Sequence, residues 1–127
     1  MIDYILNYLA DKDVCASSQE EQEALEAGIS AYLLESGIDS NDTGDYYRAF
    51  VKAHLDRIAD GDLKAYFLHY PLISGIRQIV IEFEYDKHIS EDRKRELYRL
   101  MEQLHKCGLG EVYIPVAEVK QILGVHA

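Results

Sequence analysis

The chain has 127 residues, of which 48% are hydrophobic and 28% are charged, and its formal net charge at pH 7 is −10. This length and composition are typical of a single globular domain and exclude an intrinsically disordered chain. No apolar run approaches the roughly 20 residues of a membrane-spanning helix, and the acidic N-terminal segment is unlike the basic start of a signal peptide. Two cysteines are too few for a disulfide scaffold. We therefore expect a cytoplasmic protein.

The negative charge is concentrated in one part of the sequence. The segment from Asp13 to Tyr47, here called the acidic window, has nine acidic residues and no Lys or Arg, whereas the other 92 residues carry 14 acids and 13 bases. A field of this sign repels nucleic-acid phosphates and anionic lipid headgroups. We therefore expect no direct binding to nucleic acid or to a membrane, and a basic protein is the partner that the charge favours.

Two helices are predicted in the first 36 residues. Apolar residues at helical spacing indicate a short helix over residues 1–10. Ser17 and Ser18 are each followed by Glu three residues later, a capping-box pattern that predicts a second helix ending near Gly37. Its predicted buried face consists of Leu25, Ile29, Tyr32 and Leu33. The opposite side is predicted to present carboxylates beside a small apolar surface, unless a neighbouring helix of the same chain covers it.

Two more helices are predicted before Pro71. Turn-forming residues precede a helix over residues 44–59. Its predicted inner face is Tyr47, Phe50, Val51, His54, Leu55 and Ile58. A short helix over residues 62–70 should end before Pro71, because proline disfavours helical geometry in the residue that precedes it.

After Gly75 the period of the apolar residues changes. Residues Ile79, Ile81, Phe83 and Tyr85 alternate with mostly acidic residues, which predicts a strand. Ser90 should cap a helix whose predicted buried residues are Leu97, Leu100, Met101, Leu104 and Cys107. Residues 111–115 are predicted to form a second strand and residues 116–124 a final helix.

These elements predict an α+β fold that is mainly helical, with about five helices and a small two-stranded or edge-extended sheet. The C-terminal strand, helix and strand would form a βαβ-like unit, with a parallel or an antiparallel strand pair. We expect one domain over residues 1–127, composed of a helical half, 1–70, and a half containing the sheet, 76–127.

The acidic window supplies the candidate partner-binding residues. They are Glu20, Glu23, Glu26, Leu34, Glu35, Asp39, Asp42, Asp45 and Tyr46. Tyrosine is enriched at interaction hot spots, and acidic surfaces steer basic partners toward binding. The sequence therefore predicts a protein–protein interaction module, such as an inhibitor or immunity-type protein that docks on a nuclease. Bacterial immunity proteins and phage-encoded inhibitors resemble this chain in size and charge character only.

Two alternative functions remain open. On the predicted strand, Glu82, Glu84, Asp86 and His88 would point the same way, and such a group could bind a divalent cation in a small enzyme. Alternating acids are more commonly the solvent-exposed face of a strand, where they protect its edge from mispairing. The other alternative is an accessory protein that forms homodimers through the sheet edge or the Leu34 surface. No catalytic residue, resident metal or cofactor is predicted by a recognisable motif.

Overall fold

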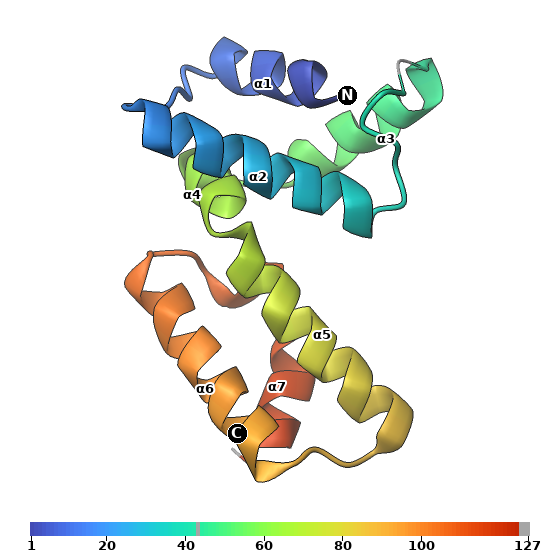
Figure 1. The fold of residues 1–127 in the computed structure, drawn as a ribbon, viewed down its shortest axis with the longest axis vertical. Helices are drawn as coiled ribbons and strands as arrows, with labels where there is room; N and C mark the ends of the chain where they lie inside the picture. Colours follow the sequence, from blue (N-terminus) through green and yellow to red (C-terminus); the bar gives the residue numbers. More distant parts are fainter. Residues whose placement is uncertain (43, 125–127) are drawn as a thin grey trace. The chain divides into compact units, whose positions relative to one another are not determined.

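The computed structural model describes residues 1–42 and 44–124, and every regular element in these ranges is helical (Figure 1). The chain divides into two compact units, Met1–Tyr70 and Pro71–Ala127. The predicted α+β fold is wrong, because the described residues contain no strand and hence no sheet. The first unit contains α1 (Ile2–Asp11), α2 (Gln19–Glu35), α3 (Asp45–Leu55), the 3₁₀ turn η1 (Asp60–Asp62) and α4 (Leu63–Leu68). Then follow α5 (Tyr70–Asp86), α6 (Glu91–Lys106), the 3₁₀ turn η2 (Glu111–Tyr113) and α7 (Val116–Leu123).

Helix α2 begins at the Ser18 cap that the sequence predicts, in a variant of the capping box in which Glu21 reaches back to Ser17, one residue before the cap. The Ser18 hydroxyl accepts a hydrogen bond from the Glu21 backbone N–H at 3.1 Å, and the Glu21 carboxylate accepts one from the Ser17 N–H at 3.2 Å. These bonds satisfy N–H groups that have no partner within the helix. Gly37, with φ of +71°, follows the last turn in the left-handed conformation that favours glycine.

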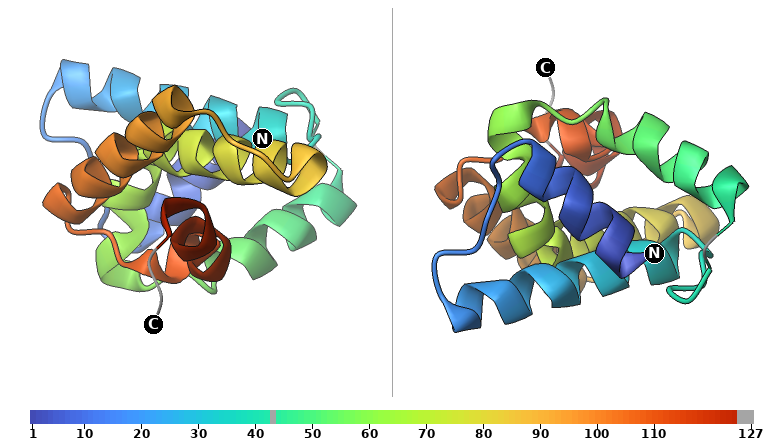
Figure 2. Two further views of the ribbon diagram at one scale, coloured as in Figure 1. Left: turned by 90° about the horizontal axis from the view of Figure 1, so that it is seen from below. Right: turned by 90° about the horizontal axis from the view of Figure 1, so that it is seen from above.

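Helix α1 packs against α2 (Figure 1), and the view from above in Figure 2 shows the two helices crossing at an angle. It is also tied to the chain after α3, because the Tyr8 hydroxyl donates to Asp56 at 2.6 Å and Lys12 pairs with Asp60 at 2.9 Å. The core of this unit is apolar and includes Ile5, Leu9, Leu25, Ile29, Leu33, Val51, Leu55, Leu63 and Phe67. The predicted buried face of α2 is confirmed, and its outer face is consequently left to solvent.

Helix α3 is only partly as predicted. Val51 and Leu55 are buried, but Tyr47 and Phe50 are 37% and 54% exposed. Each residue of a helix is rotated by about 100° from the one before it, so a face centred on Val51 and Leu55 turns Phe50 toward the solvent. The predicted inner face of α3 therefore includes residues that the structure leaves exposed.

The predicted strand around Ile79 is wrong, because this segment forms the second half of α5. Ile73, Ile76 and Val80 are buried at spacings of three and four residues, which is the helical period. Ile81 and Tyr85, expected on the buried face of a strand, are 55% and 89% exposed.

The predicted βαβ-like unit is likewise wrong, although its helix is right. The Ser90 hydroxyl caps α6 by accepting a hydrogen bond from the Arg93 N–H at 3.3 Å. Residues 111–113 form η2 instead of a strand, since no neighbouring strand in the described residues offers backbone partners. The predicted final helix is present as α7, which packs against α6.

Candidate functional site

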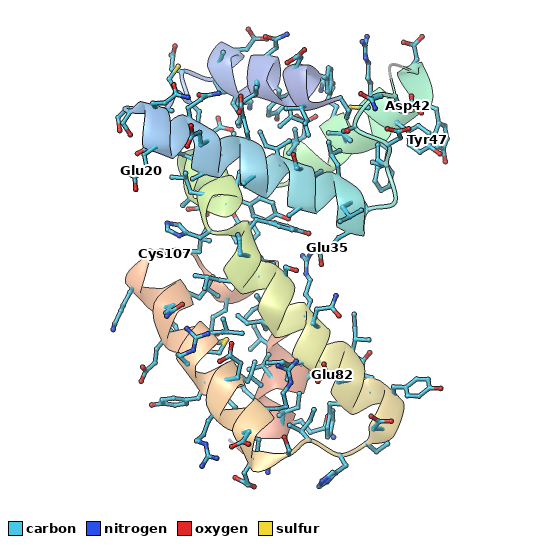
Figure 3. All side chains as sticks on the ribbon, viewed as in Figure 1. Glu20, Glu35, Asp42, Tyr47, Glu82 and Cys107 are labelled. Carbon is cyan, nitrogen blue, oxygen red and sulfur yellow. The ribbon has the colours of Figure 1, made fainter. Side chains whose placement is uncertain are left out.

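The candidate site is the outer surface of α2 together with the segment that leads into α3. Glu20, Glu23 and Glu26 are exposed on the side of α2 opposite its buried face. Glu35 and Asp39 are exposed further along the chain, and Figure 3 shows Glu20 and Glu35 at opposite ends of α2. Exposed carboxylates therefore occur in the first half of α2 and again at its last residue, with no acid over residues 27–34.

Most of these carboxylates accept hydrogen bonds from neutral groups of the same segment. Gln22 donates to Glu26 at 3.2 Å, and Asp39 accepts from the Asn41 N–H at 2.9 Å. The Asp42 carboxylate accepts from the Gly44 N–H at 2.6 Å, at the start of α3. None of these donors is a cation, so the negative charge of the carboxylates is not neutralised by them.

Glu21 is the exception within the acidic window. Among the described residues it is the one acid of this window in an ion pair, and its partner is Lys64 on α4. The hydrogen bond from Lys64 and the bonds from Ser17 hold the pKa of the Glu21 carboxyl below its ordinary value. Glu21 thus attaches α2 to α4, while the other acids of the window form no ion pair with any residue in 1–42 and 44–124.

The small apolar surface predicted beside the carboxylates is open in the structure. Leu34 is 82% exposed, and Ala27 and Ser30 are exposed as well. A surface cavity of about 470 Å³ adjoins this surface. It is lined by Met1, Ile2, Asp3, Glu26, Ala27, Ser30, Ser40 and Asn41. Asp3 and Glu26 give the cavity two carboxylates. Met1 also lines it, and the Met1 amino group donates a hydrogen bond to the Ser40 carbonyl at 2.7 Å.

Helix α3 adds an aromatic group to this unit. Tyr46, a predicted contact residue, is 77% exposed, and its ring meets that of Tyr47 edge to face at 5.2 Å between centroids. Tyr47 and Phe50, which the sequence predicts on the inner face of this helix, are further exposed aromatic residues beside it. Centring the helical face on Val51 and Leu55 would have placed Phe50 outside it, but not Tyr47, which lies four residues before Val51 on the same side of the helix.

The second candidate cluster does not form. Glu82, Glu84 and Asp86 lie on a helix, where residues two apart project about 200° from one another. Glu82 instead binds Arg93 through two hydrogen bonds of 2.9 and 3.0 Å. Over residues 1–42 and 44–124, no three His, Cys, Asp or Glu side chains are grouped closely enough to hold a metal ion. The strand on which the divalent-cation hypothesis depended is absent.

Comparisons of the chain with protein-family models, with curated proteins and with solved structures found no match. Within the described part of the chain, every helix is too short or too polar to cross a lipid bilayer.

Proposed function

We propose that this chain is a protein–protein interaction module whose Met1–Tyr70 unit docks on a basic protein. The observation that carries the proposal is the outer surface of α2, where Glu20, Glu23, Glu26 and Glu35 are exposed and no cation of the described residues pairs with them. Leu34, 82% exposed on the same helix, adds an apolar contact within the charged surface.

Charge of this kind acts on association rates and on partner choice. An anionic surface steers a cationic partner during diffusional encounter and repels anionic competitors. Enzymes that act on nucleic acids have basic active sites because their substrate is polyanionic, so an inhibitor of a nuclease is a physically suitable role. The two free cysteines, Cys15 and Cys107, support a reducing compartment such as the cytoplasm as the location.

The proposal is tested by removing charge without removing volume. In one variant Glu20, Glu23 and Glu26 are changed to Gln. In a matched control, Glu84, Asp86 and Glu102, exposed acids of the Pro71–Ala127 unit, are changed to Gln, Asn and Gln. Each immobilised protein is exposed to an extract of its native cell, and the retained proteins are identified and purified.

We expect a basic protein that is retained by the wild type and by the control but lost by the first variant. Its association rate should fall about tenfold or more from low to high salt, because screening removes the steering. Equal retention by both variants, or an association rate independent of salt, would contradict the proposal.

Self-association through Leu34 is a second candidate function, because a side chain that is 82% exposed on an apolar surface is a typical contact residue. The predicted dimer through a sheet edge is ruled out by the helical fold. Sedimentation at two concentrations, with the wild type and with Leu34→Ser, separates a dimer from a monomer that awaits another protein.

A further inference from the structure

We infer that the aromatic face of α3, defined as Tyr46, Tyr47 and Phe50, is the anchor that receives a basic amphipathic helix of the partner. This inference rests on the proposed function and names the chemistry of the partner.

The three side chains share one side of α3 and are open to solvent. Tyr46 and Phe50 are four residues apart and Tyr47 and Phe50 three apart, which places neighbouring rings on one side of the helix. Their exposed fractions are 77%, 37% and 54%. Exposed aromatic side chains gathered in this way are more typical of an interface than of an ordinary surface.

The cations of α3 are engaged elsewhere. The Arg48 guanidinium lies over the ring of Tyr4 at 5.7 Å, and the Lys52 ammonium pairs with Asp56 at 2.8 Å. Both residues lie on the side of α3 away from Tyr46 and Phe50, given the rotation of about 100° per residue. The aromatic face therefore carries no positive charge from the cations of α3.

Carboxylates lie at the amino end of the same helix. Asp42 is held there by its bond to the Gly44 N–H, and Asp45, the first residue of α3, adds a second carboxylate at this end, on the side of the helix that carries Arg48 and Lys52. Figure 3 shows Asp42 and Tyr47 at this end of the helix. Tyrosine rings beside carboxylates bind Lys and Arg, because the ring face and the carboxylate both attract a cation.

Because Phe50 is an exposed apolar ring, the partner must supply an apolar contact in addition to positive charge. A purely hydrophilic basic segment would leave this ring in contact with water, and an uncharged apolar segment would leave the carboxylates without a cation. A helix with Leu on one face and Lys or Arg beside it meets both requirements. A second copy of this chain carries the same acidic window, so its like charge opposes self-association at this face.

The test uses a defined probe and the full chain. The probe is a synthetic amphipathic helix of Leu and Lys with one Trp, and its control is a scrambled peptide of identical composition. Since the protein contains no Trp, the emission of the probe can be followed without interference. Binding is measured for the wild type, for Tyr46→Ser and Phe50→Ser, and for the matched control Tyr85→Ser, which removes a ring that is 89% exposed in the other unit.

We expect the wild type to bind the amphipathic helix about tenfold or more tightly than the scrambled peptide, with each α3 variant losing most of this preference and Tyr85→Ser keeping it. If both peptides bind equally and the Glu20, Glu23 and Glu26 variant abolishes this binding, the inference is wrong and the proposed function stands. If neither peptide binds, the inference is wrong, and the retention experiment described above decides the proposed function. Loss of the preference in Tyr85→Ser, or a dimer of the wild type that Phe50→Ser dissociates, also overturns the inference.

Discussion

Helices α2 and α4 meet backbone to backbone at Gly28 and Phe67: a Cβ atom on Gly28 would overlap the carbonyl oxygen of Phe67. This close contact lies on the buried side of α2, beside Leu25, Ile29 and Tyr32. Because one side of α2 is fixed so tightly against α4, the opposite side, with its carboxylates, must face outward. The position of the candidate surface therefore depends on a residue that has no side chain.

We predict that Gly28→Ala destabilises the protein by about 3 kcal/mol, because overpacking against backbone cannot be relieved by a change of rotamer. This loss exceeds the gain of up to about 1 kcal/mol that alanine brings to a helix interior. Urea unfolding measures the difference. Gly61→Ala is the control: no atom lies within 4 Å of its added Cβ, so it should change stability by less than about 0.5 kcal/mol. Equal effects of the two substitutions would show that the close contact is absent.

The helical nature of residues 76–86 gives a second prediction. Val80 is 3% exposed and its neighbour Ile81 is 55% exposed. Val80→Asn should therefore cost about 3 kcal/mol, through lost burial and an amide without partners, and Ile81→Asn less than about 1 kcal/mol. Thermal or urea unfolding of both variants checks this. The alternating strand would require the opposite order, with Ile81 the sensitive position.

This pair of residues also shows why the sequence predicts part of the fold and not all of it. The helices that begin with Ser18 and Ser90 were predictable, because each cap lies directly before a run of helical period. Around Val80 the apolar residues fit both the helical and the strand period, so local pattern cannot decide. The helical assignment follows from the buried residues upstream, because the stripe that includes Val80 continues at helical spacing back to Ile73. Pro71 is tolerated in the first turn of this helix, because the backbone N–H groups there have no partner within the helix.

The candidate site was likewise predictable from the sequence only in part. The exposed carboxylates of α2 were predictable, because the local sequence alone gives both the positions of the acidic residues and the side of the helix on which each one lies. The exposure of Tyr47 and Phe50 was not, because it depends on which side of α3 meets the rest of the unit, and contacts between distant segments such as Tyr8 with Asp56 contribute to that choice. Tertiary contact of this kind has no local signature.

The Glu21 carboxylate gives a prediction for pH. Its pKa in the folded protein lies below its ordinary value of 4.5, chiefly through the hydrogen bond from Lys64. A lowered folded-state pKa contributes stability above the ordinary pKa and loses it as the pH falls through the folded-state value. The difference in melting temperature between wild type and Glu21→Gln should therefore be largest near neutral pH and shrink below about pH 4.5. Glu20→Gln, next to it and without an ion pair in the described residues, removes no link to α4 and serves as the matched control.

The combined change of Glu20, Glu23 and Glu26 to Gln should leave the stability of the fold nearly unchanged. These carboxylates are exposed and bound only to neutral groups within the described residues, so no ion pair there is lost. Removing repulsion between like charges three residues apart gains a few tenths of a kcal/mol per pair, and losing the attraction between Glu20 and the amino end of α2 costs a similar amount. The melting temperature should therefore stay within about 3 °C of the wild type, as followed by circular dichroism. A large decrease would mean that these acids support the fold, and the loss of a partner in this variant would then report unfolding instead of missing charge.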